Sequence, residues 1–531
     1  AGAGASAGSR RDGADVGAAG VGTEVGADGD GVDVVLITNG PGELTSWVQP
    51  VAAALRARGC ADAAARTRVS VVLTPCPHAS GAEPEAAMRI ADSGRVCVAG
   101  DFFRLLLFLR GAGWRRWGFR RRGVVVFLGG DQLHAVLLAW RLGYACVIYA
   151  EEEARWPRLA RYALRSPELL VKVPQNARER GSARVVGDLF ADAVRGGSAD
   201  GSAGAKFDAS VLPLANARAG VTDTDAPAVA DAVGHVNSDA NVLTVGLLPG
   251  SKLAKLLIAV PFMLATADAL VKILALASAG DNAASRNVRF VLPLAPTADV
   301  DTLARCARAE SNEYVRRLGW AEADLEDPAG ELEVCAIRTR AGTRASVVRA
   351  SLHRHAAPYE VYTECDLVLT TIGTNTAELG VLGVPMVVVL PTQALEVFKG
   401  GAGGIAGLLC RLPGALGDFF TRRVNAALLA AAGALAWPNR WAGREVVPEL
   451  VGALTPETVA RACASLLLEP ARLRAMRAEL RAASGSQGAA HAGGAAHALV
   501  EMAAEAVVER WPQGSGSGDG RGPNEAAFAH A

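Results

Sequence analysis

A β-branched run, a glycine-containing turn and a helix follow one another repeatedly in this chain, and that order constrains the fold more than any other feature. The first example is the run at residues 34–37, the turn at 39–42 and a helix that begins near Thr45. Further strand-like runs occupy residues 69–73, 124–128, 145–149, 169–173, 243–248, 289–292, 367–370 and 386–390. Because strands that alternate with helices pair in parallel, the sequence predicts an α/β protein with doubly wound sheets.

Segments of low complexity divide the chain into domains. Residues 1–32 are rich in Gly, Ala and Asp and residues 512–531 in Gly and Ser, so both ends are predicted to be disordered. The remaining boundaries predict an N-terminal domain at 33–195, a linker or insertion at 196–241, a C-terminal domain at 242–483 with an insertion at about 300–357, and a last helix within 484–511. Two such domains enclose a cleft, and ligands of doubly wound sheets bind beyond the carboxyl ends of the strands.

Charge and cysteine usage exclude several classes of protein. The 54 basic residues are balanced by 54 acidic ones, so no overall field attracts a polyanion, and a nucleic-acid partner is not expected. The nine cysteines include no CxxC pair, which argues against a zinc knuckle or a disulfide framework and favours idle thiols in a reducing compartment. The longest charge-free apolar stretches, such as residues 256–267, are well short of the ~20 residues that a spanning helix needs, so no integral membrane segment is expected.

Two turns in the C-terminal domain suit a phosphate. Each follows a predicted strand and begins a helix, where unpaired backbone N–H groups and the positive helix end attract an anion. Their candidate ligands are Gly250, Ser251, Lys252, Gly373, Thr374, Asn375 and Thr376. Glu378, one turn into the second helix, can accept hydrogen bonds from a ribose diol. Two such turns on one domain favour a nucleoside diphosphate, although an ordinary strand-to-helix turn also explains the first of them.

Three segments of the same domain resemble the C-terminal signatures of the lipid-A-disaccharide synthase family. They are LLPGSK at 247–252, GTNTAE at 373–378 followed by GVPMVVV at 383–389, and PNRWAGREVVPEL at 438–450, in the family's order and spacing. The family consists of inverting, metal-independent glycosyltransferases of the GT-B architecture that use UDP-sugar donors at a membrane surface. The resemblance therefore implies two Rossmann-like domains facing a cleft, C-terminal helices that cross back, and hexosyltransferase activity with a UDP-sugar substrate, no metal and no further cofactor.

The third signature adds Asn439, Arg444 and Glu449 to the residues that the resemblance places at the donor site. A capped turn that leads into a helix from Pro456 explains the same residues without a ligand.

The N-terminal half is similar to the family more loosely. Gly42-Glu43, Gly130-Asp131, Tyr149 and the turn at 186–188 fall where the family has its Gly-Glu turn, its acidic loop, its tyrosine and its interdomain turn. Three changes stand out in this chain: Leu-Thr-Ser-Trp follows Gly-Glu, Lys252 replaces the family's loop arginine, and Asp188 replaces its histidine.

An inverting transfer needs a base that takes the proton of the acceptor hydroxyl. Asp131, which follows a strand and two glycines, is the predicted base, and Glu43 is the alternative. His134, one turn along the same helix, could orient or replace that base. Asp131 could instead serve only as the N-cap of that helix, and His134 could hold a purely structural position.

An apolar and basic segment at residues 102–122 bears on the acceptor. Aromatic rings and arginines together suit a membrane interface with anionic lipid, and the candidate contacts are Phe103, Leu107, Trp114, Arg115, Arg116, Trp117, Arg120 and Arg121. A core helix followed by a solvated basic loop is an alternative, and stacking on single-stranded nucleic acid is a weaker one.

The predicted function is transfer of a GlcNAc-type sugar from a UDP donor to a lipid-linked acceptor, at a membrane surface in the cytoplasm or plastid stroma. A related transferase with another glycolipid or a polyprenyl acceptor is a second possibility. A nucleotide-sugar-binding module without catalysis is a third.

Overall fold

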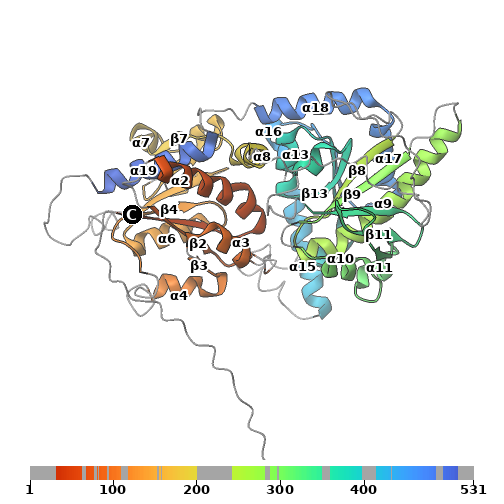
Figure 1. Ribbon diagram of the computed structural model, residues 1–531, viewed down its shortest axis with the longest axis horizontal. Helices are drawn as coiled ribbons and strands as arrows, with labels where there is room; N and C mark the ends of the chain where they lie inside the picture. Colours follow the sequence, from red (N-terminus) through yellow and green to blue (C-terminus); the bar gives the residue numbers. More distant parts are fainter. Residues whose placement is uncertain are drawn as a thin grey trace, which may run out of the picture.

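The computed structural model describes residues 31–61, 67–76, 81, 83–92, 95–108, 118–151, 155–156, 158–199, 242–280, 287–295, 298–349, 359–397, 414–431, 433–485 and 494–511. Figure 1 shows these residues as two α/β bodies that lie side by side. Residues 1–30 and 512–531 of the predicted disordered ends and residues 200–241 of the predicted linker lie outside the described residues. Val32 belongs to the segment predicted to be disordered, but it begins the first strand.

The first body contains a seven-stranded parallel sheet with the order β3-β2-β1-β4-β5-β6-β7. Its strands are β1 (Val32–Thr38), β2 (Thr67–Leu73), β3 (Val96–Cys97), β4 (Gly123–Phe127), β5 (Ala145–Ala150), β6 (Arg161–Leu164) and β7 (Ala183–Val185). The strand order reverses between β1 and β4, and at such a switch point the loops that follow the two strands diverge and leave a crevice at the carboxyl edge.

Both faces of this sheet are covered. Val34 and Leu36 of β1 belong to one apolar cluster and Val35 and Ile37 to another, because successive side chains of a strand point to opposite faces. The covering helices and turns are α1 (Pro41–Glu43), the π-helix η1 (Leu44–Val48), α2 (Gln49–Ala61), α3 (Glu83–Ile90), η3 (Ala99–Asp101), α4 (Phe102–Leu107), α6 (Gln132–Leu142), η4 (Pro167–Lys172), α7 (Gln175–Glu179) and α8 (Leu189–Ala199).

One predicted strand in this domain is wrong. Residues 169–173 form most of the 3-10 helix η4, which begins with Pro167 after an extended Ser166. Leu169 is buried whereas Val171 is 81% exposed, so the apolar run does not keep one face inward with the two-residue period of a strand. The sheet uses β6 and β7 in its place.

The second body contains an eight-stranded sheet with the order β10-β11-β12-β9-β8-β13-β14-β15. Its strands are β8 (Val242–Leu248), β9 (Asn287–Pro293), β10 (Ala323–Glu326), β11 (Glu333–Thr339), β12 (Arg344–Val348), β13 (Leu367–Thr371), β14 (Met386–Pro391) and β15 (Glu449–Gly452). Strand β12 pairs in parallel with β9. Strand β11 pairs antiparallel with β12, and β10 pairs antiparallel with β11 at the edge of the sheet. The described part of the expected insertion, residues 300–349, therefore extends the sheet of the domain.

The helices of the second body are α9 (Leu253–Gly280), α10 (Val300–Ala307), α11 (Glu313–Leu318), α12 (Tyr359–Thr363), α13 (Thr374–Leu382), η6 (Thr392–Val397), α15 (Gly414–Ala431), α16 (Trp437–Ala442), α17 (Pro456–Leu467) and α18 (Pro470–Gly485). Among the described residues, α9 is long and apolar enough over Leu253–Ala277 to cross a membrane, although Lys255, Asp268 and Lys272 interrupt a segment that is otherwise uncharged. About two-thirds of its most apolar window is buried, as in a core helix, and Phe262 is fully buried.

The last helix, α19 (Gly494–Arg510), returns to the first body, where it packs on α2, β5 and α8. Figure 1 shows it in blue beside α2, while the preceding α18 lies on the second body. Leu499 and Met502 of α19 are buried in the same apolar cluster as Leu36 of β1. Two Rossmann-like domains with a C-terminal helix that crosses back form the expected GT-B architecture, and this part of the sequence analysis is confirmed.

Candidate functional site

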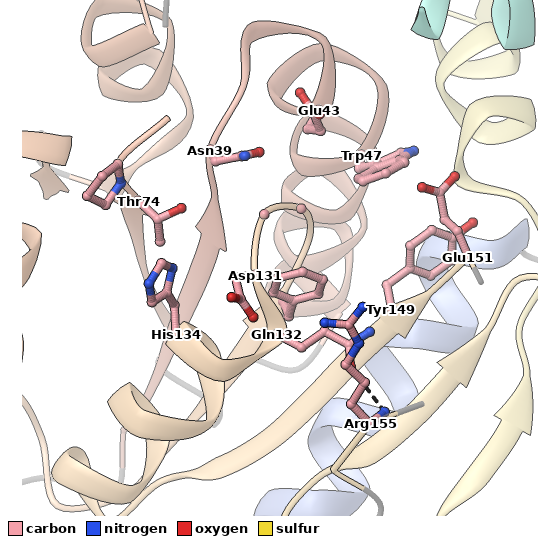
Figure 2. Close-up of a pocket in the computed structure, with 14 residues that line it drawn as sticks. Asn39, Glu43, Trp47, Thr74, Asp131, Gln132, His134, Tyr149, Glu151 and Arg155 are labelled. Atoms are coloured by element: carbon pink, nitrogen blue, oxygen red, sulfur yellow. Dashed lines mark hydrogen bonds between the residues drawn. The ribbon is translucent and has the colours of Figure 1, made fainter. Parts of the chain in front are cut away.

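A cavity of about 660 Å³ opens at the carboxyl edge of the first sheet (Figure 2). The loops after β1, β4 and β5 bring three carboxyl groups to it, those of Glu43, Asp131 and Glu151. Asn39, Trp47 and His134 also line it. We call this cavity the carboxylate pocket.

Glycines allow the Glu43 side chain to occupy its place in the pocket. Gly129 has φ +127°, and a Cβ atom there would lie 2.9 Å from the Glu43 Cγ. Because an L side chain rarely adopts that conformation and would also clash, only glycine fits between β4 and Glu43. The Gly-Gly turn predicted before Asp131 thus sets how closely the loops after β1 and β4 approach each other.

Asp131 is the N-cap of α6. Its Oδ1 accepts a hydrogen bond of 2.9 Å from the backbone N–H of Leu133, so the structure contains the capping interaction that the sequence offered as an alternative. The residue is nevertheless exposed and lines the carboxylate pocket. Capping uses one oxygen and fixes the direction of the side chain.

His134 packs against the aromatic residues of α4 at the edge of the same pocket. Its ring centroid lies 4.9 Å from that of Phe102 and 6.2 Å from that of Phe103, both in edge-on geometry. Figure 2 shows it beside Thr74, on the side of the pocket away from Glu151.

Glu151 was not singled out from the sequence, although three consecutive glutamates directly after a strand were an available signal. Its side chain is 18% exposed and lies 3.7 Å from the Arg165 guanidinium. Burial raises the pKa of Glu151 to about 8. The Arg165 guanidinium opposes this rise in pKa, and the negative charges of Asp188 and Glu43 add to it.

The two glycine turns of the second domain are neighbours, because β8 and β13 pair in parallel. Lys255 on α9 donates a hydrogen bond to the carbonyl of Ile372, which joins the first turn to the second. Its Nζ lies 3.2 Å from the position of a Cβ on Gly373, a residue with φ +154° at the N-cap of α13. The structure thus brings Gly250, Ser251, Lys252, Gly373, Thr374 and Asn375 to one region at the N-termini of two helices.

Lys255 is the cation that sequence reasoning missed at this place. Burial and the nearby Lys252 ammonium lower the pKa of Lys255 to about 8, and the charge of Glu43 acts in the opposite direction. That interaction places a carboxylate of the first domain near a cation of the second. The LPGSK motif favoured Lys252, which precedes α9, whereas Lys255 lies in the first turn of that helix.

Glu378 is buried and faces the domain junction, away from the surface where the ribose was expected. It is 4% exposed, and it accepts hydrogen bonds from the Ser46 hydroxyl at 2.8 Å and the Tyr359 hydroxyl at 3.4 Å. Burial raises the pKa of this carboxyl. Thr376 is also fully buried, and its hydroxyl donates to the carbonyl of Gly373 and accepts from the N–H of Trp437.

Asn439 and Glu449 hold the third signature in its folded shape. The Asn439 Oδ1 accepts from the N–H groups of Val446 and Val447 at 2.6 and 2.9 Å, and its amide donates to Glu449 at 2.7 Å. Glu449 also accepts from the N–H groups of residues 435 and 436, at 2.9 Å each. Both side chains are therefore engaged in hydrogen bonds around the third signature, whereas the helix from Pro456, α17, is capped by Thr455.

The third signature still lines a second cavity, of about 820 Å³. Ile372, which precedes the Gly373 turn, borders it together with Arg440 and Arg444. Arg444 is exposed and forms an ion pair with Glu479 of α18 at 2.5 Å.

Direct contacts join the two domains between the cavities. A Cβ on Gly42 would lie 2.8 Å from the Thr374 hydroxyl, so the first turns of α1 and α13 touch. The Arg165 guanidinium carbon of the first domain lies 5.0 and 4.5 Å from the ring centroids of Trp437 and Trp441 of the second.

The α4 side of the first domain exposes apolar side chains. Phe103 is 52% exposed, Leu107 64% and the adjoining Phe108 62%. Arg121 is exposed nearby and Arg120 is half-buried. The other predicted membrane contacts, Trp114, Arg115, Arg116 and Trp117, lie outside the described residues.

No protein-family model matches this chain, and no curated protein matches it. Among solved structures, it is similar to the UDP-GlcNAc 2-epimerase of Neisseria meningitidis bound to UDP-GlcNAc, with 12% identity, a TM-score of 0.41, and coverage of 90% of this chain and 100% of that chain. It is also similar to Anabaena Alr3699/HepE in complex with UDP and glucose, with 12% identity, a TM-score of 0.35, and coverage of 89% of this chain and 97% of that chain. A family 9 glycosyl transferase of Veillonella parvula is similar with 13% identity, a TM-score of 0.30, and coverage of 83% of this chain and 98% of that chain. Similarity at this level carries no argument about the activity of this chain.

Proposed function

We propose that this protein is an inverting, metal-independent glycosyltransferase that moves a GlcNAc-type sugar from a UDP donor to a lipid-linked acceptor, as the resemblance to lipid-A-disaccharide synthases implies. The observation that carries the proposal is the arrangement at the domain junction. Glu43 of the first domain lies near Lys255, which joins the paired glycine turns of the second domain, and Asp131 lines the same pocket as Glu43.

This arrangement matches what a transfer from a diphosphate requires. The N-termini of α9 and α13 and the Lys255 ammonium stabilise the charge that develops on the departing UDP. Asp131 takes the proton of the acceptor hydroxyl, with Glu43 as the alternative base. The base and the cation belong to different domains, so the reacting sugar lies between them.

The lipid nature of the acceptor rests on the exposed apolar side of α4. Phe103, Leu107 and Phe108 suit the interface of a membrane to which the protein binds peripherally. Seven described cysteines are free thiols, which accords with a reducing compartment such as the cytoplasm or plastid stroma. Another glycolipid or a polyprenyl acceptor fits the same features.

The base is tested by Asp131→Asn. The variant is expected to bind UDP normally in isothermal titration calorimetry and to transfer sugar from labelled UDP-GlcNAc to membrane lipids about 10²–10⁴-fold more slowly. Mass spectrometry of the labelled lipid identifies the acceptor. Turnover near that of the wild type would return the role to Glu43 or His134, and absence of UDP binding by the wild type at millimolar ligand would refute the proposal itself.

A nucleotide-sugar-binding module without catalysis is the second candidate. Asp131 caps a helix, and Glu378 and Glu449 form hydrogen bonds within the protein. These contacts favour the second candidate, because they give each carboxylate a structural role that does not require catalysis. UDP binding without any transfer or hydrolysis of a UDP-sugar would support this candidate.

A further inference from the structure

Four buried polar atoms of the carboxylate pocket have no hydrogen-bond partner within the described part of the chain. They are Asn39 Oδ1, Trp47 Nε1, His134 Nδ1 and Glu151 Oε1. A buried polar group without a partner costs about 1–3 kcal/mol, so such groups in a folded protein are usually satisfied by a ligand or water. Both hydrogen-bond donors and acceptors are present, which matches a ligand rich in hydroxyl groups.

Trp47 and Glu151 meet on one side of this pocket. Trp47 is 7% exposed, and its ring lies edge-on to Tyr149 with the centroids 5.7 Å apart. Figure 2 shows the indole nitrogen turned to the side on which the Glu151 carboxyl lies. The Tyr149 hydroxyl is already engaged, because it donates to the carbonyl of Gly187 and accepts from the N–H of Leu189, each at 3.2 Å.

The Arg165 guanidinium lies closer to the carboxylate of Asp188 than to that of Glu151. It approaches Asp188 with two nitrogens, at 3.2 and 3.1 Å, whereas Glu151 lies at 3.7 Å. Trp437 and Trp441 flank the guanidinium and hold it in that position.

The remaining charged groups around Glu151 come from several elements. Glu43 of α1 adds a third carboxylate, Arg440 of α16 supplies a more distant cation, and Arg155 follows on the same loop. A negative Glu151 would face Glu43 across the pocket and would share the Arg165 guanidinium, at 3.7 Å, with the closer Asp188. A neutral carboxyl group removes that repulsion and gains a proton with which to donate a hydrogen bond.

We propose that Glu151 acts in its protonated form as a hydrogen-bond donor to a hydroxyl-rich head group, such as a sugar ring, in the carboxylate pocket. The inference rests on the proposed function and names the substrate class that this pocket accepts. Trp47 donates a second hydrogen bond, and Asn39 accepts one from a hydroxyl of the same group.

Octyl glucoside below its micelle concentration is a suitable probe, because it carries a sugar head group on one chain and requires no turnover. Glu151→Gln keeps a hydrogen-bond donor and is neutral at every pH, whereas Glu151→Ala has neither property. At pH 6.5 the wild type and Glu151→Gln are expected to bind the probe with similar affinity, and Glu151→Ala about tenfold more weakly. At pH 9 the wild type is expected to weaken about tenfold and Glu151→Gln to remain unchanged.

Thermal unfolding tests the protonation without any ligand. The folded-state pKa of Glu151 lies above that of an unfolded glutamate, so the folded chain holds one more proton between about pH 4.5 and 8 and loses stability as the pH rises through that window. The difference in Tm between Glu151→Gln and the wild type should therefore be more positive at pH 8.5 than at pH 5. Glu331→Gln, on an exposed turn of the second domain, is the matched control and should show no such change.

The outcomes separate the inference from the proposed function. Equal pH dependence of Tm in Glu151→Gln and the wild type would show that Glu151 is ionised, and unchanged probe binding in Glu151→Ala would show that it does not contact the head group. Either result would overturn the inference. Failure of the wild type to bind UDP would refute the transferase while leaving both of these measurements interpretable.

Discussion

Ser46→Ala is expected to weaken the contact between the two domains. The Ser46 hydroxyl is fully buried on η1 and donates a hydrogen bond of 2.8 Å to Glu378 on α13. Without it, the only hydrogen-bond contact left to the Glu378 carboxyl among the described residues is the Tyr359 hydroxyl at 3.4 Å, which is longer than an ordinary O–H···O bond. The substitution removes a single oxygen atom, so the main effect is a buried acceptor that has lost its best donor.

The expected loss of stability follows from that geometry. Leaving a buried acceptor unsatisfied costs about 1–3 kcal/mol, and for a domain of this size about 1 kcal/mol corresponds to a change in Tm of ~2–4 °C. Thermal unfolding followed by near-UV circular dichroism should therefore show Ser46→Ala melting about 2–12 °C below the wild type. Ser465→Ala is the control, because Ser465 is exposed on α17 and its hydroxyl bonds only within its own helix.

Ligand binding separates a junction role for Glu378 from a ribose-binding role. If Glu378 stabilises the junction, Glu378→Gln keeps an acceptor for Ser46, and both variants bind UDP within about twofold of the wild type. The reasoning would be refuted by a Ser46→Ala protein that melts within 1 °C of the wild type. A Glu378→Gln variant with normal Tm that binds UDP at least tenfold more weakly would return Glu378 to the donor site.

Two further predictions concern the donor turns and α4. Lys255→Met should weaken UDP binding at least tenfold in calorimetry, because the ammonium between the two glycine turns interacts with a charged ligand. Lys272→Met, on an exposed part of α9, is the control and should bind UDP as the wild type does. Equal affinities of the Lys255→Met variant and the wild type would contradict the assignment of the anion site. Phe103→Ser combined with Leu107→Ser should reduce flotation of the protein with anionic liposomes. Leu276→Ser is the control and should not, because Leu276 is 74% exposed on α9, away from this segment. A wild type that never floats at low salt would favour a water-soluble acceptor.

The core of both sheets could be predicted from the sequence. The β-branched runs that form β1, β4, β8 and β13 are buried on both faces, so each reads as a continuous apolar segment followed by a glycine turn. Strands β10 to β12 contain charged residues and lie toward the edge of their sheet, so they lack the continuous apolar pattern and were not predicted. Turn chemistry was equally local, which is why the glycine turns at 249–252 and 371–378 were found.

The partners of individual side chains could not be predicted in this way. The position of Glu378, one helical turn after a glycine, suggested a ribose ligand. In the structure its carboxyl instead accepts a hydrogen bond from the hydroxyl of Ser46, 332 positions away in the chain. Burial raises the pKa of Glu151, and the Arg165 guanidinium, which is shared with Asp188, only partly opposes that rise. Each of these three residues follows a different strand.

The sequence by itself determined the buried central strands and the glycine turns that follow them, because hydrophobic period and glycine position act over a few residues. Only the tertiary structure decided which carboxylates are exposed, paired or neutral and which lysine lies between the turns. Those properties depend on burial and on distances between charges that the chain brings together from several elements. Glu43 near Lys255 and Glu151 near Arg165 are the two cases on which the proposed chemistry of this site depends.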